Sequence, residues 1–426
     1  MKHEMFVRLR IIISVFVCLF FTAGIPDFAQ AKEAKLLNEV NGFAVIQELK
    51  DLYKNNPEFR VLMDKALNQA VTPPGGCTKG KDLGLTMQQA FKLKNNEEFC
   101  WVGRPFSDLV IVFESWLTSL VFPAEPYTGF AYYKMLYSLV YQNNWGMQFL
   151  ENEPGLGWTR KFTKARGQFM DTDGSMPVSV TRAWKKNIGE LEWSRYKEPS
   201  GGYKNFNAFF TRSLKEPQPV AGKGDDSILV SPADSSINIV NSNLKATTQI
   251  HTKYGENLNI RELLAGSKYA DSFNGGTAIS CVLMPNVYHR YHSPVTGEVV
   301  ESKDVNGAYF GMGGNFYSYI NNGNVGGYLS NYGIFGIYHR GYYIIKTKKY
   351  GNVAMIPIGL DDVSSVNFVE KYADIPSARS AQKVTKGDEL GHFAYGGSTV
   401  VLLFEPGVIQ NLSVNQGMQI GKLAPK

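Results

Sequence analysis

The chain has 426 residues, of which 44% are hydrophobic and 19% charged, and its formal net charge is +6. This length allows two or three domains, and the composition excludes a disordered chain, a coiled coil and a multi-span membrane protein. The small net charge does not favour nucleic acid as a partner. Glycine (42 residues) and aromatic residues (13%) are abundant, which indicates a large share of β-structure.

The first 31 residues have the pattern of a secretory signal peptide. Basic residues precede an apolar run at residues 11–25, and small residues follow at Ala29 and Ala31, where a signal peptidase cuts. The run is short for a membrane-spanning helix, which needs about 20 apolar residues. We therefore predict an exported protein, periplasmic or secreted, that loses residues 1–31. An uncleaved N-terminal anchor is the alternative.

The cysteines fit an exported protein, because export brings a chain into an oxidising compartment. Cys77 and Cys100 flank a polar stretch, and a disulfide bond between them is left open by the sequence. Cys281 lies in the apolar run 278–283, which predicts a buried free thiol. The cysteine spacing matches no zinc motif.

Residues 33–185 have a mostly helical pattern. Apolar residues recur with near-helical spacing at residues 35–53, 57–71, 87–94, 106–121 and 127–150. Asp108 and Glu114 interrupt one of these runs and favour a packed amphipathic helix over a membrane span. No catalytic constellation is visible here, so we predict that residues 32–200 form a helical capping or scaffolding domain.

After about residue 200 the pattern changes to short β-type runs separated by Gly, Asn and Asp. Strands are predicted at residues 228–230, 237–240, 278–284, 342–347, 353–358 and 400–404. Residues 306–333 are rich in Gly, Asn and Tyr, which predicts a long loop or irregular hairpins over a site. The expected fold class is α+β, with an α-helical N-terminal domain followed by a β-rich domain over residues 201–426.

Reactive side chains gather in four short segments of the β-rich part. These are residues 231–237 (SPADSSI), 288–297 (YHRYHSPVTG), 386–393 (KGDELGHF) and 396–405 (GGSTVVLLFE). Each has an ordinary explanation by itself, such as a turn at Asp234 or a tight Gly-Gly turn before a strand. However, two glycines also permit a strained peptide bond beside the Ser398 hydroxyl. That hydroxyl is then placed to attack the preceding carbonyl, with an imidazole and a carboxylate to manage the proton.

In their joint order, these segments and residues 207–212 (NAFFTR) resemble the phosphatidylserine decarboxylase family over about half of the chain. The resemblance implies that Ser398 attacks the Gly397 carbonyl and converts the peptide bond to an ester. Elimination then leaves a dehydroalanine, which hydrolyses to a pyruvoyl group. The expected products are residues 32–397 and 398–426. The self-made pyruvoyl cofactor would accept the electrons that remain on the α-carbon when an amino acid loses CO2.

The resemblance also assigns roles to side chains. Asp234 and His292 match the family positions that activate the serine. His289 matches the position linked to decarboxylation, where it would protonate the carbanion. The expected catalytic residues are therefore Asp234, His289, His292 and Ser398, with no metal. The sequence indicates no particular substrate-binding residues.

Several positions depart from the family pattern. Ser235 stands where glycine is usual after Pro-Ala-Asp, and residues 338–340 (YHR) replace the usual Asn-Glu-Arg. Gly396 stands where leucine is usual before Gly-Ser-Thr. Residues 357–365 and the helical N-terminal half are more similar to the soluble branch that includes aromatic amino-acid decarboxylases. These departures favour a free amino acid as the alternative substrate, whereas the family's motifs make phosphatidylserine the leading one.

A lipid substrate calls for peripheral contact with a membrane. The apolar residues 116–122 offer such a surface, and a core helix explains them equally well. The sequence leaves the oligomeric state open.

Two other classes of protein share some of these features. A secreted zinc hydrolase would use His289 and His292 as ligands, but the chain has no His-Glu-x-x-His motif. Residues 292–299 and 386–390 resemble the hammerhead half-repeats of biotinyl and lipoyl carrier domains. Those carriers need a lysine at the hairpin tip, where this chain has residues 396–398, so we attribute that likeness to the fold.

Overall fold

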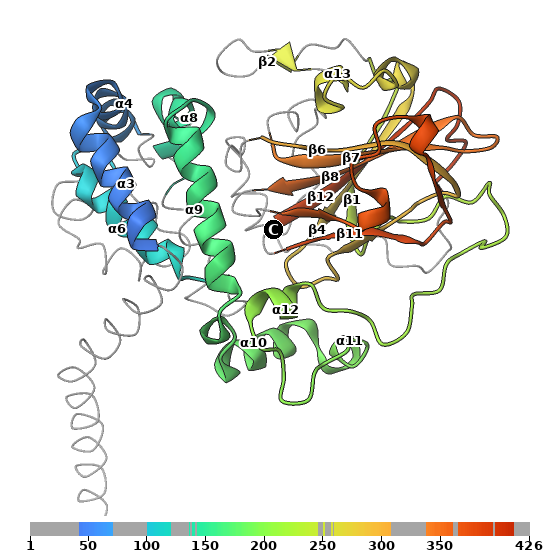
Figure 1. Ribbon diagram of the computed structural model, residues 1–426, viewed down its shortest axis with the longest axis horizontal. Helices are drawn as coiled ribbons and strands as arrows, with labels where there is room; N and C mark the ends of the chain where they lie inside the picture. The colour runs from blue at the N-terminus through green and yellow to red at the C-terminus, as the bar shows by residue number, and fades with distance from the viewer. Residues whose placement is uncertain are drawn as a thin grey trace, which may run out of the picture.

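The computed structural model describes residues 42–70, 100–120, 136, 139–140, 143–245, 250–251, 257–258, 260–307, 338–360, 365–394 and 397–412. It confirms the α+β class, with helices in the first half of the chain and antiparallel strands in the second (Figure 1). The predicted signal peptide, the helix at 87–94 and most of the loop at 306–333 lie outside the described residues. Within the ranges given above, no helix has the length and apolar character needed to cross a membrane.

The helices of the N-terminal half pack around one apolar core. They are α3 (Gly42–Asn55), α4 (Pro57–Asn68), α6 (Phe106–Leu117), α8 (Asn144–Glu151), α9 (Gly155–Met170), α10 (Val178–Ile188), α11 (Glu190–Trp193) and α12 (Phe206–Phe210). Aromatic rings fill the centre, where Phe113 meets Trp158 edge-on with ring centroids 4.8 Å apart. The same apolar cluster includes Phe210, so the helical core continues past residue 200.

Three of the predicted helices are confirmed as α3, α4 and α6. Helix α4 begins where its sequence says it should, because the Asn56 side chain accepts a hydrogen bond from the Phe59 amide (3.0 Å) and proline follows at the first position. In α6, Trp116 and Leu117 are 1% and 0% exposed. These two residues of the suggested membrane surface therefore belong to the core.

Seven strands form the main sheet, in the order β1-β4-β12-β8-β7-β6-β10 with every neighbouring pair antiparallel. Their bounds are β1 (Ser236–Ser242), β4 (Thr277–Leu283), β12 (Gly397–Phe404), β8 (Asn352–Leu360), β7 (Arg340–Lys346), β6 (Gly297–Val305) and β10 (Gln382–Val384). The prediction of a strand at residues 228–230 is wrong, because this segment runs as an irregular connection before β1. The short pair β2 (Ile250–His251) and β3 (Asn257–Leu258) stands apart from the main sheet.

The main sheet is buried on both faces, and successive residues of a strand point to opposite faces. One face packs on α13 (Ile260–Leu263), and the other on a three-stranded sheet of β5 (Arg290–His292), β11 (Glu389–Phe393) and β9 (Val366–Phe368). In β12, Val401 faces the α13 side and Val400 faces the three-stranded sheet. The register of β12 is unbroken, so Ser398 points with Val400 towards the three-stranded sheet.

The two segments identified as half-repeats lie side by side. Strands β5 and β11 pair directly, and the backbone beyond them continues the contact. The Ser293 amide donates to the Asp388 carbonyl (2.8 Å), and the Gly387 amide donates to the Ser293 carbonyl (2.9 Å). This pairing brings the histidine segment against the Lys-Gly-Asp-Glu-Leu segment.

The described cysteines differ in state. Cys281 is a free thiol and 2% exposed, as predicted, and burial raises its pKa to about 11. Cys100 is disulfide-bonded, and Cys77, with which the sequence left a bridge open, lies outside the described residues. The Cys281 thiol is therefore protonated at neutral pH and is a packing group rather than a nucleophile.

Candidate active site

The predicted cleavage bond lies at the start of β12, between two neighbouring strands. Ser398 pairs with Leu283 of β4 on one side and with Gly359 of β8 on the other. The Ser398 side chain is buried, and its Oγ has no hydrogen-bond partner among the described residues. Leaving a buried hydroxyl unpaired costs about 1–3 kcal/mol, so such a group calls for an explanation. A nucleophilic role provides one.

Strand register brings Asp234 to the same end of the main sheet. Ser236 of β1 pairs with Val282 of β4, so the chain just before β1 runs beside Leu283. Leu283 is also the β4 partner of Ser398. Since neighbouring strands are about 4.8 Å apart, two strand spacings, or about 10 Å, separate the backbones of Ser398 and the Asp234 segment.

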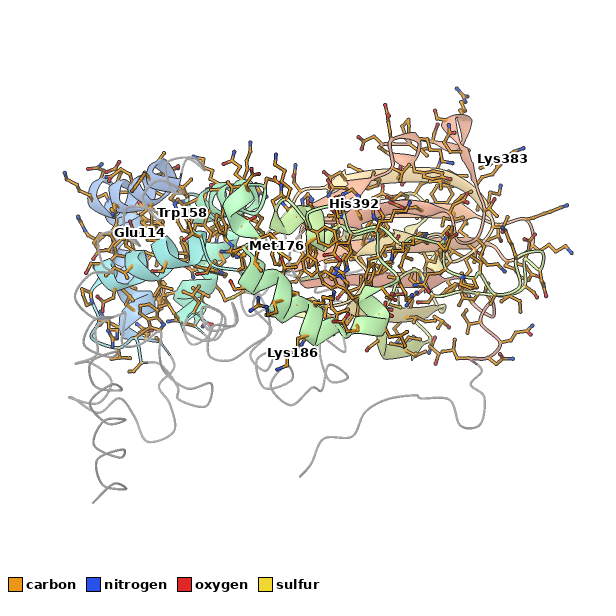
Figure 2. All side chains as sticks on the ribbon, turned by 90° about the horizontal axis from the view of Figure 1, so that it is seen from below. Glu114, Trp158, Met176, Lys186, Lys383 and His392 are labelled. Carbon is orange, nitrogen blue, oxygen red and sulfur yellow. The ribbon has the colours of Figure 1, made fainter. Side chains whose placement is uncertain are left out.

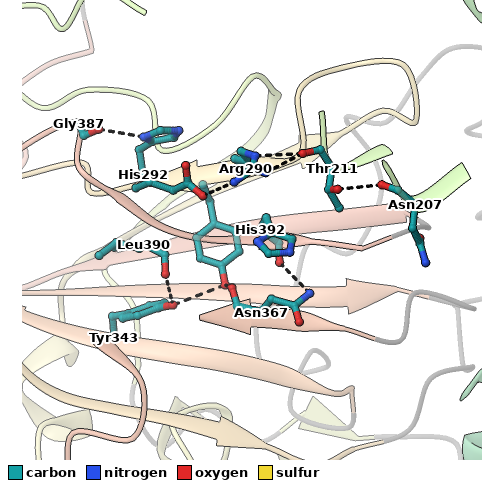
Figure 3. A network of polar contacts seen from close by, with 11 residues as sticks. Asn207, Thr211, Arg290, His292, Tyr343, Asn367, Gly387, Leu390 and His392 are labelled. Carbon is teal, nitrogen blue, oxygen red and sulfur yellow. Dashed lines mark hydrogen bonds and ion pairs between the residues drawn. The ribbon is translucent and has the colours of Figure 1, made fainter. Parts of the chain in front are cut away.

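His292 lies next to Asp234. The His292 amide donates to the Pro232 carbonyl (2.7 Å), two residues before Asp234. The Nδ1 atom of His292 lies 2.8 Å from the Gly387 carbonyl oxygen (Figure 3). A carbonyl only accepts hydrogen bonds, so Nδ1 carries the proton and, in the neutral ring, Nε2 is left able to accept one. Gly387 has φ +90°, in the left-handed region that favours glycine, and this turn aims its carbonyl at the imidazole.

Asp234 acts on His292 through charge rather than through a hydrogen bond. In a serine-protease triad an aspartate accepts the hydrogen bond from Nδ1 of the histidine. Here the Gly387 carbonyl accepts it. Asp234 Oδ1 instead accepts from Gln218 Nε2 (2.8 Å). Burial raises the pKa of Asp234, and the positive charge of Arg195, the Gln218 hydrogen bond and His292 act in the opposite direction.

His289 is fully buried and neutral at pH 7. Its ring packs against Phe210 with centroids 3.8 Å apart. Burial, followed by the positive charge of Arg212, lowers the pKa of His289 to about 3. Nδ1 lies 2.8 Å from the Val287 carbonyl and carries the proton, while Nε2 has no hydrogen-bond partner among the described residues. In the uncut chain, His289 must therefore receive a proton at Nε2 before it can donate one there.

Two arginines hold the histidine segment in place. The Arg212 guanidinium donates to the Val287 carbonyl (2.9 Å), beside His289. Arg290 donates to the Thr211 carbonyl (2.8 Å) and pairs with Glu389 at 2.6 Å (Figure 3). Both arginines lie within the sequence motifs, but no role for them was predicted from the sequence. A charged residue in a segment that becomes buried usually needs a partner, and this could have marked them.

A buried lysine fastens the segment that leads to Asp234. Lys386 is 2% exposed, and its Nζ donates to the carbonyls of Gly222 (2.7 Å), Asp225 (2.8 Å) and Ile228 (2.9 Å). Three acceptors satisfy all three ammonium protons. Residues 222–228 are thereby tied to the turn that carries Gly387. The irregular path of residues 228–230, predicted as a strand, follows from these contacts.

The two histidines do not form a visible metal site. His289 and His292 bond to carbonyls of different segments, Val287 and Gly387. Among the residues that the structure describes, no group of three or more His, Cys, Asp or Glu side chains is arranged to hold a metal ion. The geometry therefore gives the zinc-hydrolase alternative no support.

The depressed pKa of His289 predicts acid-sensitive folding. The unfolded chain takes up a proton at His289 near pH 6.5, whereas the folded protein does so only near pH 3. Stability is therefore unaffected by this group above pH 6.5 and falls as the pH is lowered from 6.5 towards 3. Between pH 8 and pH 5 the Ser398→Ala protein should lose about 2 kcal/mol from this group. The double variant Ser398→Ala/His289→Gln should lack that part of the loss in urea unfolding at the two pH values. An equal loss in both proteins would contradict this account of His289.

Comparison with known proteins agrees with this geometry. The sequence model of the phosphatidylserine decarboxylase family matches residues 206–424, just over half of the chain. A phosphatidylserine decarboxylase proenzyme of Fusobacterium nucleatum is 34% identical over 218 residues, covering 51% of this chain and 65% of the relative. The corresponding proenzyme of Chlamydia caviae is 31% identical over 237 residues, covering 54% and 72%. Phosphatidylserine decarboxylase proenzyme 3 of Schizosaccharomyces pombe is 34% identical over 256 residues, covering 58% and 23%.

Residues 206–424, which hold the central strand with the buried Ser398 and the segment with the two histidines, are the part of the chain that matches this family. The chain belongs to the phosphatidylserine decarboxylase family. It spans 65% and 23% of the length of the Fusobacterium and Schizosaccharomyces relatives. The match begins at Phe206, so helices α3 to α11 lie outside it.

Proposed function

We propose that this chain is the proenzyme of a pyruvoyl-dependent phosphatidylserine decarboxylase that cuts itself between Gly397 and Ser398. The observation that carries the proposal is the buried Ser398 Oγ. It lacks a partner among the described residues, and it points to the face of the main sheet on which the histidine segment packs. The family match and the proenzyme relatives support the same chemistry.

The cut is a rearrangement carried out by the chain itself. His292 Nε2 takes the proton of the Ser398 hydroxyl, and Oγ attacks the Gly397 carbonyl carbon. The carbon–nitrogen bond of the peptide then breaks, and the proton passes to the Ser398 nitrogen, which leaves an ester between Gly397 and Ser398. The negative charge of Asp234 stabilises His292 while it holds the proton. Loss of the Ser398 α-proton next breaks the Cβ–Oγ bond and releases Gly397 as a carboxylate. Water finally replaces the nitrogen, which leaves as ammonia.

The residues around position 398 fit a pyruvoyl group. The group would stand at the second residue of β12, held by strand pairing to Leu283 and Gly359. His289 Nε2 is a buried nitrogen without a partner in the described part of the chain, and we assign the proton exchange to it. A pyruvoyl carbonyl supplies an electron sink for the carbon that loses CO2. The chain's own contribution is to orient that carbon, exclude water and move a proton at His289.

Release of CO2 from defined substrates tests the activity. The purified protein is incubated with phosphatidylserine vesicles, L-tryptophan and L-serine, and labelled CO2 is measured. We expect release from the phospholipid and at least about 100-fold less from either free amino acid, because a site fitted to a head group leaves its polar groups unpaired with a smaller substrate. Faster release from L-tryptophan would overturn phosphatidylserine as the substrate. Release by the Ser398→Ala variant would overturn the pyruvoyl mechanism.

A further inference from the structure

A cleft separates the helical half of the chain from the three-stranded sheet. It has a volume of about 730 Å³, and its walls come from α9, α12, β9 and β11. Helix α9 runs along the side of the helical half that faces the strands (Figure 1), and His392 lies at the side of the strand part nearest the helices (Figure 2). The α9 wall lies outside the family match, which begins at Phe206.

The proposed cleavage site lies close in sequence to one wall of the cleft. Ala394 lines it, and Ala394 is four residues before Ser398, so their Cα atoms are at most about 14 Å apart. Thr211 also lines it and follows Phe210, whose ring packs on His289. The Phe393 amide donates to the His289 carbonyl (2.9 Å), beside Ala394. Lining residues of the cleft thus border the His289 segment, and one of them precedes Ser398 by four positions.

The α9 wall is positively charged. Arg160 and Lys164 are one helical turn apart and face the cleft, whereas Trp158 and Phe162 on the other side of the helix are buried in the aromatic core. Lys161 also borders the cleft but pairs with Glu48 at 2.6 Å. Neither Arg160 nor Lys164 pairs with a carboxylate in the part of the chain that the structure describes.

Most of the other lining residues carry polar side chains. Asp171 is the one carboxylate among the described lining residues, and Asn207 Nδ2 donates to its Oδ1 (2.9 Å). His392 and Asn367 form the opposite wall (Figure 3). Burial, aided by the positive charge of Arg290, lowers the pKa of His392, so the imidazole is neutral at pH 7. The described lining contains no Phe, Tyr, Trp, Leu, Ile or Val side chain, and apolar ligands favour such side chains.

We infer that this cleft binds the phosphate ester of the substrate head group, through Arg160 and Lys164 of α9. The inference rests on the proposed decarboxylation of a serine phospholipid. A cation on the reacting carboxylate would stabilise the ground state and slow the loss of CO2, so the cations must serve another anionic group. In a serine phospholipid that group is the phosphate ester. A guanidinium can donate two parallel hydrogen bonds to two phosphate oxygens. The helical domain thereby supplies a substrate contact that the matched part of the chain lacks.

Binding to the uncut Ser398→Ala protein tests this inference without requiring catalysis. Isothermal titration calorimetry would use glycerophospho-L-serine, inorganic phosphate, L-serine and L-tryptophan as probes. We expect glycerophospho-L-serine to bind, and each added change, Arg160→Gln or Lys164→Gln, to weaken its binding at least about tenfold, as is usual for a lost charge-assisted contact. Lys186→Gln removes the same charge from an exposed site on α10 and should leave the affinity unchanged.

The probes separate the possible results. Inorganic phosphate that binds as tightly as glycerophospho-L-serine, with the same loss in the α9 variants, would confirm phosphate recognition and assign the site to free phosphate. Tighter binding of L-tryptophan would overturn the inference, and so would full affinity in an Arg160→Gln/Lys164→Gln variant. Lack of glycerophospho-L-serine binding would overturn it even if the protein releases CO2 from phosphatidylserine. Failure of that release would count against the proposed function instead.

Discussion

Replacing Ser398 by alanine is expected to keep the chain in one piece. The wild-type protein should yield a fragment of residues 398–426 whose first residue is blocked to N-terminal sequencing, since a pyruvoyl group has no amine. Without Oγ there is no nucleophile for the Gly397 carbonyl, so cleavage should fall below detection. Intact-mass analysis of both proteins measures this. The variant should fold normally, because it removes a buried hydroxyl that has no partner among the described residues.

Ser280→Ala is a matched control for that experiment. Ser280 is 0% exposed, and its Oγ likewise lacks a partner among the described residues. It lies on β4, next to β12, but pairs with Val401 rather than with Ser398. The Ser280→Ala protein should therefore cut itself at the wild-type rate. A small fragment from Ser398→Ala, or a wild-type chain that stays whole while it releases CO2, would contradict self-processing at Ser398.

Removing the imidazole of His292 is expected to slow self-cleavage by about 10²–10⁴-fold, the usual contribution of a general base. Asp234→Asn should slow it less, by about 10–100-fold, because Asp234 contributes charge and makes no hydrogen bond to the ring. The asparagine keeps Oδ1 and with it the hydrogen bond from Gln218. Appearance of the small fragment with time, followed by mass spectrometry after synthesis, measures both rates.

The pH dependence of cleavage and a control variant test the role of Asp234. Burial raises the pKa of Asp234, so cleavage in the wild type should decline on acidification earlier than an ordinary aspartate would make it decline. That part of the pH dependence should vanish in Asp234→Asn. Asp173→Asn removes a carboxylate from an exposed pair with Lys204 and should leave the rate of self-cleavage unchanged. A larger effect of Asp234→Asn than of His292→Ala would reverse the roles given to the two side chains.

Local patterns predicted the elements that carry the site. The short apolar run at 400–404 predicted a strand, and that strand orients Ser398. The helical spacing at 106–121 predicted α6, and the run that begins at Pro57 predicted α4. Helix α9 was not predicted, because glycines at positions 155, 157 and 167 weaken the helical signal. Burial of Trp158 and Phe162 stabilises it instead, and burial is a property of the tertiary structure.

Hydrogen bonds from the two histidine rings to backbone carbonyls could not be predicted from the sequence. The partner of His292 Nδ1 is a carbonyl 95 positions away, and every residue type has a carbonyl, so no motif marks it. The same holds for the Val287 carbonyl that fixes the tautomer of His289. The positive wall of the cleft was missed because Arg160 and Lys164 sit in a segment with the composition of an ordinary surface helix. Only the fold shows what that surface faces.

The position of β12 determines whether the smaller cleavage product stays bound to the rest of the protein. A cut at its first residue would leave residues 398–404 paired on both sides, with β4 and with β8, deep within the main sheet. The product would then be a permanent subunit rather than a released peptide. Its place is set while the chain is still continuous, so maturation runs in one direction. If the mature enzyme is unfolded and its two pieces are separated, the peptide bond that held the central strand to the rest of the chain is no longer there to guide refolding.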